Sequence, residues 1–491
     1  MRFGPIRLHY LLAYAIVGAY MPYLPVFLGR DLGMPDWQIG WIAGMYGMAV
    51  ILSPPIVTYL ADRRLSGRTL IGLAYGLTGC TLLALAFARG FIPVLLISMV
   101  FSMVYTPMFA LLDGLTFSAS AAAQAEGRPV PPYDRIRVWG SFGFMIPAFV
   151  LFFALRAGAA SGRAAIFAAA VAAGLGLLCL PLLPRIAPGR PGPETSLPGA
   201  PVPETSLPGA LVLDPGAPVP ETSLADAPVP ATSLAGALIP GAPVQETSLA
   251  GALIPGAPVP ETSLAGALVP GALVPGAPVP EASLTTPPST TAWDVLRRPP
   301  TRDLIIPLGL LFASIAVFYG FYARLVLEVG IDPSWVGLVM NLGVVSELPF
   351  MLAAGPLLRR YTLRQLIVFG ALCLVVRMVL LASVADPRVI VASQLLHGPI
   401  VVAIYLIPPM YLNLKAPAGA RNSVQGIYAM VCFGVARLLG SVAGGYAAGR
   451  GLAWAFGLGA VLAATALVWL WLRFFDAAAD TALRSRPLSR S

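Results

Sequence analysis

Lysine, histidine and cysteine are almost missing from this 491-residue sequence. It has two histidines (His9 and His397), four cysteines and one lysine (Lys415), and charged residues make up only 11% of the chain. No HExxH, GxSxG or GxxxxGK[ST] motif occurs, so the sequence argues against a metalloprotease, a serine hydrolase or a nucleotide-driven pump. The cysteines are isolated within apolar stretches, which predicts neither a disulfide framework nor a metal site. We therefore expect no enzymatic activity, no cofactor and no metal.

Apolar residues are abundant instead. Hydrophobic residues make up 57% of the chain and the mean hydropathy is +0.81, values that a soluble protein of this length could not sustain. Twelve apolar stretches are each about 20 residues or longer, enough to cross a hydrocarbon core of about 30 Å. The predicted spans are Leu8–Leu28, Trp37–Leu60, Thr69–Ala88, Phe91–Asp113, Ile136–Arg156, Arg163–Leu183, Asp303–Leu327, Trp335–Leu358, Arg364–Val384, Arg388–Leu412, Arg421–Ala447 and Gly451–Phe475. The fold class is an all-α polytopic membrane protein.

The spans fall as six plus six around one insert. We expect an N-terminal six-helix half over residues 1–183, a linker over 184–292, a C-terminal six-helix half over 293–475 and a tail over 476–491. Two six-helix pseudo-repeats are typical of carriers whose substrate site lies between the repeats.

The insert is rich in proline, alanine and glycine and repeats itself. The segment Pro215–Leu224 returns as Pro255–Leu264, at irregular spacing from its other copies. Dense proline blocks helices and central strands, so we expect a disordered tether. It serves either as a linker without specific function or as a docking segment through its proline motifs.

The placement of basic residues predicts the orientation. Most of the 31 Lys and Arg residues fall in the loops and tails that share a side with the N-terminus, which makes that side cytoplasmic. The net charge of +9 is thus explained by the lipid bilayer, without a nucleic-acid partner. The run at Met1–Leu28 is too long for a signal peptide and we expect it to be an uncleaved first span.

Four ionisable residues lie deep within spans of the second half: Glu347, Arg377, His397 and Arg437. Such groups are costly in a bilayer and usually functional. Glu347 is the predicted proton carrier with Arg377 as its partner, because moving between apolar and cationic surroundings changes how strongly a carboxylate holds its proton. The alternative is a permanent Glu347–Arg377 salt bridge that only fixes packing. His397 is either a core histidine, a proton relay or a substrate ligand, and Arg437 either binds an anionic substrate group or pairs with Glu347.

Tyrosines dominate the polar side chains of the first half. Aromatic walls with phenolic hydroxyls suit an organic substrate with a ring. Ordinary lipid-facing or interfacial tyrosines are the alternative. The predicted substrate cavity consists of Tyr14, Tyr20, Tyr23, Asn341, Gln394 and Gln425.

Two further polar groups belong to the first half. The loop residues Asp62, Arg63, Arg64, Gly67 and Arg68 are either a latch that holds one facing of the carrier or a basic loop that only sets topology. Asp113 is expected at the inner end of the fourth span, where Arg135 or Arg137 could pair with it.

Several segments resemble the major facilitator superfamily, in its branch of phenylpropionate-permease-like and nucleoside:proton-symporter-like proteins. Tyr20–Leu28 resembles the end of the first helix, and Leu60–Arg64 with Gly67 and Arg68 resembles the loop after the second. Tyr133–Phe144, which contains Arg137, Trp139, Gly140 and Ser141, resembles the entry to the fifth helix. The residues of the second half that match the branch are Glu347, Arg377, Gln394–Gly398 and Gln425–Gly426.

The scarcity of lysine beside abundant arginine, alanine and glycine indicates a bacterial genome rich in G and C, and hence the inner membrane. The basic loops predict that both termini are cytoplasmic, and we expect a monomer. The resemblance implies a secondary transporter that works by alternating access and is coupled to protons. It implies a small organic solute, with aromatic carboxylates first and nucleosides or sugars next. An exporter of drugs or metabolites, and a non-transporting receptor or scaffold on a carrier fold, are the alternatives.

Overall fold

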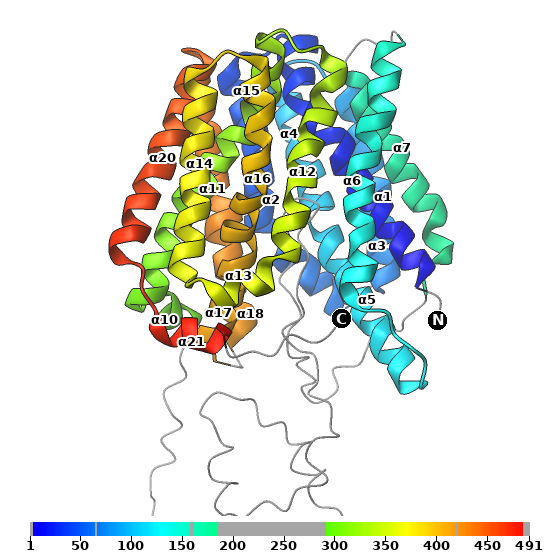
Figure 1. Ribbon diagram of the computed structural model, residues 1–491. Coiled ribbons are helices and arrows are strands. Elements are labelled where there is room, and N and C mark those ends of the chain that lie inside the picture. The colour runs from blue at the N-terminus through cyan, green and yellow to red at the C-terminus, as the bar shows by residue number, and fades with distance from the viewer. Residues whose placement is uncertain (1–2, 64–65, 158–161, 185–290, 418–419, 485–491) are drawn as a thin grey trace, which may run out of the picture. The chain divides into compact units, whose positions relative to one another are not determined.

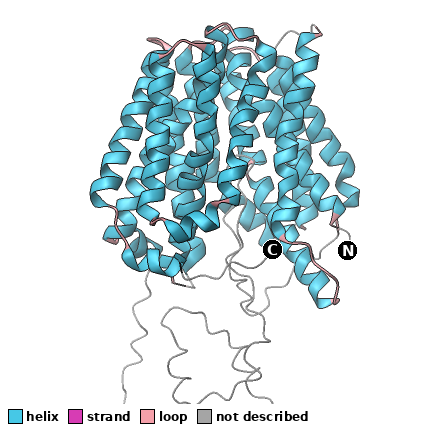
Figure 2. Cartoon of the chain, viewed as in Figure 1, coloured by secondary structure: helices cyan, strands magenta, loops and turns pink. Residues whose placement is uncertain are grey.

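The computed structural model describes residues 3–63, 66–157, 162–184, 291–417 and 420–484, apart from the side chains of 54–63, 125, 134, 483 and 484. This part of the chain is helical and contains no strand (Figure 2). The proline-rich insert, including both repeats named above, lies outside the described residues, so the expectation of a disordered tether stays a prediction.

The first half contains six long helical segments. They are α1 (Gly4–Val26) with a π-turn η1 (Phe27–Asp31), α2 (Asp36–Arg63), α3 (Gly67–Phe87), α4 (Phe91–Tyr105) continued by α5 (Pro107–Ala125), α6 (Tyr133–Arg156), and α7 (Arg163–Cys179) with a 3₁₀ turn η2 (Leu180–Leu182). Ser66 begins α3 by accepting a hydrogen bond from the Thr69 N–H. Pro107 separates α4 from α5 because proline cannot donate a backbone hydrogen bond.

The second half repeats this layout with more interruptions. Its elements are α10 (Ala292–Arg297), α11 (Pro299–Glu328), η4 (Pro333–Trp335), α12 (Val336–Leu352), α13 (Ala354–Arg360), α14 (Leu363–Ser383), α15 (Pro387–Ala392), η5 (Ser393–Leu396), α16 (His397–Val401), η6 (Val402–Leu406), α17 (Ile407–Lys415), α18 (Arg421–Ala429), η8 (Met430–Ala436), α19 (Arg437–Ala448), α20 (Leu452–Arg473) and α21 (Ala477–Arg484). A capping box between Thr362 and Gln365 begins α14. The wide π-turns η6 and η8 lie beside His397 and Arg437, and such turns recur at functional sites.

Eleven of the twelve predicted spans are confirmed. Among the described residues, eleven helical segments are long and apolar enough to cross a membrane. The remaining predicted span coincides with α2, whose charged residues lie only at its two ends. One boundary was wrong: the fourth span does not end at Asp113, because the helix continues through a run of small side chains to Ala125.

Glycines let the helices of each half approach closely. A Cβ on Gly143 of α6 would lie 2.1 Å from the backbone oxygen of Leu11 in α1, and one on Gly18 of α1 would lie 2.3 Å from that of Phe144. These contacts tie the first and fifth spans together through backbone packing. In Figure 1 the helices of both halves run side by side, and they form one compact unit.

The two halves meet at the end of the bundle opposite the N-terminus. Asp36 at the start of α2 forms an ion pair with Arg324 of α11. A Cβ on Gly40 would lie 2.5 Å from the Ser441 oxygen and 2.8 Å from the Gly445 Cα, so α2 and α19 touch through their backbones. The described contacts therefore close the bundle at this end.

Candidate functional site

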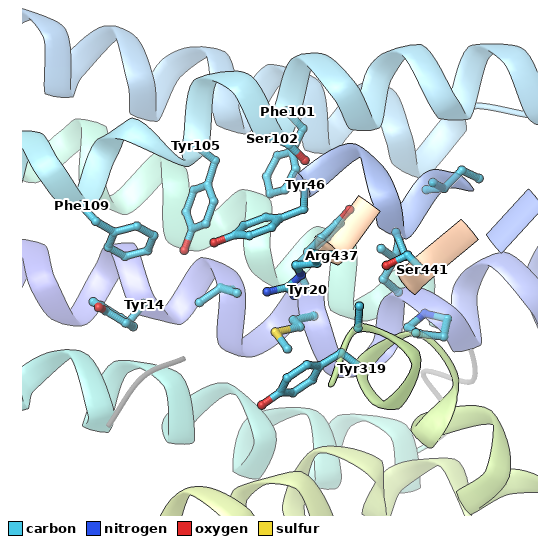
Figure 3. A pocket seen from close by; sticks show the side chains of 18 residues that line it. Tyr14, Tyr20, Tyr46, Phe101, Ser102, Tyr105, Phe109, Tyr319, Arg437 and Ser441 are labelled. Atoms are coloured by element: carbon cyan, nitrogen blue, oxygen red, sulfur yellow. The ribbon is translucent and has the colours of Figure 1, made fainter. Parts of the chain in front are cut away.

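A cavity lies between the halves near the middle of the bundle. Its aromatic wall comes from five helices: Tyr14 and Tyr20 of α1, Tyr46 of α2, Phe101 and Tyr105 of α4, Phe109 of α5, and Tyr319 of α11. Figure 3 shows these rings around Arg437 of α19. The cavity has a volume of about 90 Å³, which leaves room for a few water molecules or part of a small ligand.

Arg437 is the one charged side chain among the described residues that line this cavity. Its guanidinium carbon lies 4.3 Å from the ring centre of Tyr46 and 5.6 Å from that of Tyr319. Both separations are within the range of a cation–π contact. No hydrogen bond or ion pair of Arg437 occurs among the residues that the structure describes, so the pairing with Glu347 that the sequence left open is not formed. The site thus combines a cation with aromatic faces, which suits an anionic group attached to a ring.

A second set of charges is buried behind the cavity. Arg377 of α14, His397 of α16 and Glu347 of α12 are 1%, 5% and 0% exposed. Arg377 Nη1 lies 3.0 Å from His397 Nδ1, and His397 Nε2 lies 3.1 Å from Glu347 Oε1. The imidazole therefore stands between the two charges, and the direct Arg377–Glu347 ion pair considered from the sequence does not occur among the described contacts.

This order fixes the direction of the hydrogen bonds. A guanidinium can only donate, so Nδ1 of His397 accepts from Arg377, and a neutral imidazole then carries its hydrogen on Nε2. That hydrogen faces both Glu347 Oε1 and the Tyr319 hydroxyl, which lies 3.3 Å from Nε2. Neither Glu347 oxygen has a hydrogen bond of good geometry. His397 can therefore donate to either neighbour but not fully to both.

Other side chains hold Arg377 in place. Its Nη2 donates to Gln394 Oε1, and its guanidinium carbon lies 3.8 Å from the ring centre of Phe318. Ser346 donates to the backbone oxygen of Gln394 at 3.2 Å, which links the segment before His397 to α12. These contacts account for a buried arginine that has no carboxylate directly beside it.

Tyr319 joins the two sites, and the sequence did not single it out. One edge of this α11 side chain lines the cavity, while its hydroxyl contacts His397. The sequence pattern around a tyrosine in an apolar span is the same whether the side chain packs in the core, faces lipid or forms a hydrogen bond with a functional residue. Its role becomes visible only in the structure, where α11, α16 and α19 bring Tyr319 close to both His397 and Arg437.

The polar cluster of the first half is also buried. Asp113 Oδ2 lies 3.5 Å from Arg137 Nη1, which confirms Arg137 as one of the two predicted partners. The other oxygen, Oδ1, accepts hydrogen bonds from the hydroxyls of Tyr133, at 2.6 Å, and Tyr10. Arg137 Nη2 donates to the hydroxyl of Tyr14 at 3.0 Å. Since Tyr14 lines the cavity, this cluster reaches the site through one aromatic side chain, as the second-half cluster does through Tyr319.

The motif residues after Arg137 pack rather than bind. Trp139 is 38% exposed on the outside of α6. A Cβ on Gly140 would lie 2.6 Å from the ring of Tyr14, so glycine lets that tyrosine lie flat against α6. Ser141 is half-buried and outside the cavity lining.

Four predicted cavity residues lie elsewhere. Tyr23 accepts from the Gly337 N–H at 3.2 Å, and Asn341 donates to the Met145 oxygen at 3.1 Å, so both join the halves at the closed end. Gln394 holds Arg377, and Gln425 donates to the Pro409 oxygen at 2.7 Å. Each of these side chains bonds a neighbouring segment through one polar atom, while Gln394 Nε2 and Gln425 Oε1 have no hydrogen-bond partner among the described residues. Tyr14 and Tyr20 do line the cavity.

Hydrogen bonds shift the pKa of Asp332 at the closed end. Asp332, just before η4, accepts hydrogen bonds from the Ser334 hydroxyl and backbone N–H, and these lower the pKa of Asp332. The ionised carboxylate caps η4, whose Trp335 packs edge-on against Phe152 of α6 at 4.9 Å.

The predicted gating loop is described only in part. Arg68 donates to the Leu183 oxygen at 3.2 Å, and Gly67 is the first residue of α3. Arg64 and the side chains of Asp62 and Arg63 lie outside the described residues, so the latch stays a prediction. Among described residues, no group of three or more His, Cys, Asp or Glu side chains could hold a metal ion.

Comparison with known proteins places the chain in a family. The sequence profile of the MFS_1 like family matches residues 5–458. The chain belongs to this family. A solved structure of the nucleoside transporter NupG superposes with a TM-score of 0.66 over 99% of this chain and 100% of that one, at 16% identity, which shows a shared fold.

Relatives with higher sequence identity match over shorter segments. A protein of Escherichia coli K12 named as a probable 3-phenylpropionic acid transporter is 29% identical over 186 residues, 37% of this chain and 47% of that protein. The maltose permease of Geobacillus stearothermophilus is 28% identical over 149 residues, 30% of this chain and 37% of that protein. The matched segments span less than half the length of these relatives. All are named as transporters or permeases and none as an enzyme, in agreement with the sequence prediction.

Proposed function

We propose that this protein is a secondary transporter that moves a small organic solute together with a proton by alternating access. The observation that carries the proposal is a cavity built from both halves, with a buried carboxylate one hydrogen-bonded histidine away from its wall. A site shared by two halves can open to either side when the halves rock. A buried ionisable group without a permanent partner can exchange a proton during that motion.

An aromatic carboxylate is the favoured substrate. Arg437 would hold the carboxylate, and the rings of Tyr20, Tyr46 and Tyr105 would enclose the aromatic part. The name of the E. coli relative agrees with this choice. Nucleosides and sugars come next, in line with NupG and the maltose permease.

Proton coupling would run through Tyr319. The Tyr319 ring contacts Arg437 and its hydroxyl contacts His397, so this side chain links the cavity to the buried carboxylate. A substrate carboxylate on Arg437 would neutralise that cation, and the loss of a nearby positive charge would favour the protonated form of Glu347, so that substrate and proton are carried together. Glu347 is the group that gains and loses the proton, and Arg377 positions His397.

The described conformation is then the inward-facing one. With the N-terminus on the cytoplasmic side, the closed end formed by Asp36, Arg324 and the α2–α19 contact faces outward. We place the protein in the inner membrane of a bacterium, as a monomer with both termini cytoplasmic.

The test is proton flux into proteoliposomes that contain a pH-sensitive dye. Wild type and Glu347→Gln are challenged with 3-phenylpropionate, benzoate, uridine and maltose. Substrate-triggered proton flux should occur with one class of substrate and disappear in Glu347→Gln, while exchange of labelled substrate persists. Glu328→Gln, which changes an exposed glutamate at the end of α11, is the matched control and should retain the flux.

Three results would contradict the proposal. Equal proton flux in wild type and Glu347→Gln would make Glu347 a packing residue. Substrate exchange without any proton movement in wild type would remove coupling and leave a uniporter. No exchange with any of the four compounds would exclude the proposed substrate classes.

A further inference from the structure

A second cavity lies away from the central site, on the flank of the second half. It is an apolar groove between α12–α13, α14 and the α16–η6 segment, lined by Phe350, Leu357, Tyr361, Gln365, Leu366, Phe369, Pro399, Val402 and Ala403. The groove has a volume of about 380 Å³, which is larger than that of the central cavity. Figure 1 labels the helices that border it.

The groove is open sideways, where a bilayer would lie. Phe369 is 51% exposed and Tyr361 is 38% exposed, although both line it. From Phe350 to Tyr361 the helices advance about 16 Å at 1.5 Å per residue, roughly one leaflet of a 30 Å hydrocarbon core. A polar solute would gain nothing in a groove whose lining is apolar apart from Tyr361 and Gln365.

The rim of the groove is basic. Arg359 and Arg360 are adjacent and exposed at the end of α13, directly before Tyr361. The guanidinium carbon of Arg360 lies 5.8 Å from the ring centre of Tyr361, and neither arginine forms an ion pair among the described residues. The nearby Asp480 of α21 already accepts from the Leu363 N–H at 2.7 Å. Two unpaired cations therefore stand where an apolar groove meets the membrane surface.

We propose that this groove binds an anionic phospholipid, with one acyl chain between α12–α13 and α14 and the phosphate on Arg359 and Arg360. The bilayer supplies this ligand, and its charge complements the rim. Tyr361 marks the depth at which chain and headgroup meet, since tyrosine favours that interface. Basic pockets between helices near the membrane surface bind such headgroups. The floor of the groove is Pro399, Val402 and Ala403, so the chain would pack against the helix that carries His397.

The experiment uses the purified full chain in detergent, with dioleoyl phosphatidylglycerol or dioleoyl phosphatidylcholine added. Native mass spectrometry counts retained lipids, and thermal unfolding follows the same samples. Wild type should retain phosphatidylglycerol in preference to phosphatidylcholine and unfold several degrees higher with it. Arg359→Gln/Arg360→Gln should lose that preference and most of the thermal shift.

Two further variants keep the result interpretable. Arg297→Gln/Arg298→Gln removes a matched pair of adjacent, exposed arginines where α10 meets α11, and should behave as wild type. Leu357→Trp enlarges a half-buried side chain in the groove and should reduce retention of both lipids. Equal retention of both lipids by wild type, or an undiminished preference in Arg359→Gln/Arg360→Gln, would overturn the proposal. Because no transport is measured, these outcomes are independent of the proposed carrier function.

Discussion

At the residue scale, Arg437 contacts aromatic rings and, among the described residues, no carboxylate, so its charge remains available to select an anionic substrate. A guanidinium stacked on Tyr46 and Tyr319 keeps its outer edge available for hydrogen bonds. A carboxylate can accept two parallel, charge-assisted hydrogen bonds from that edge, whereas the hydroxyls of a ribose are neutral acceptors and form weaker hydrogen bonds. Arg437 therefore discriminates by charge, and the tyrosines by shape.

Replacing Arg437 with Gln should weaken binding of carboxylates selectively. Charge-assisted hydrogen bonds contribute about 1.5–3 kcal/mol, so we expect affinity for 3-phenylpropionate to fall about tenfold to a hundredfold while affinity for uridine changes little. Calorimetric titration of the purified protein measures both. Arg437→Lys keeps the charge but loses the planar guanidinium, so its affinity for 3-phenylpropionate should lie between those of wild type and Arg437→Gln. A uniform loss for both ligands would show that Arg437 only supports the cavity wall.

At the residue scale, the sequence showed which residues of the apolar spans are ionisable, but not how their side chains lie relative to one another. Glu347, Arg377 and His397 stand out because ionisable groups are rare in apolar runs. Their order, with the imidazole in the middle, depends on how three helices cross. Tyr23 and Asn341 do not line the described cavity and bond the facing backbone instead, and a side chain that does so has the same sequence signature as one that binds a ligand.

At the scale of elements, α17 is tied to the segment after α20 by a polar clasp. Asp476 Oδ2 lies 2.5 Å from Lys415 Nζ and accepts from the Tyr411 hydroxyl at 3.0 Å, while Oδ1 accepts from the Ala479 N–H at 3.0 Å. Burial alone would raise the pKa of Asp476, but these hydrogen bonds and the lysine charge outweigh it and lower the pKa. The ionised form is thus favoured in the folded protein.

This clasp predicts a pH dependence of stability. A carboxylate with a lowered folded-state pKa stabilises the fold above its unfolded-state pKa, and the contribution disappears as the pH falls through the folded-state value. The difference in unfolding temperature between wild type and Asp476→Asn should stay constant from pH 7 to about pH 5 and narrow below about pH 4. Thermal scans in detergent measure it. Glu328→Gln should show no such difference, and a gap that widens toward acid pH would refute the assignment.

Element boundaries were largely predictable because the bilayer fixes span length. Most predicted spans begin and end within a few residues of the helices. The interruptions in the tenth span were not predictable. The change from α15 to η5 at Ser393 and the π-turn at Val402 arise where Ser346 and Gln394 bond across helices, which a hydropathy pattern does not contain.

At the scale of the whole bundle, closure depends on glycine. The backbones of α2 and α19 meet at Gly40 and Gly445, and a side chain there has no space. The close contact between Gly40 and Gly445 belongs to the closed arrangement of this end, so we expect it to limit how far the two halves can move relative to each other.

Gly40→Ala should therefore hold this end open. Its methyl group would lie 2.5 Å from the Ser441 oxygen, an atom of the backbone that cannot move aside locally. We expect a cysteine at position 102, in the cavity wall, to be labelled faster from the outer face and substrate exchange to slow several-fold. Gly76→Ala is the matched control, because its Cβ would meet only Leu177 at 3.9 Å. Unchanged labelling would mean that α2 and α19 do not limit closure.

The solitary cation in the cavity has a consequence for the energy source. A carboxylate that travels with one proton carries no net charge, so membrane voltage would neither drive nor oppose its uptake, and only the pH gradient would count. A neutral nucleoside that travels with one proton moves a positive charge, worth about 2.3 kcal/mol per 100 mV. Since Arg437 is the charge that lines the cavity, its preferred ligand decides whether the carrier is electrically silent or generates a current.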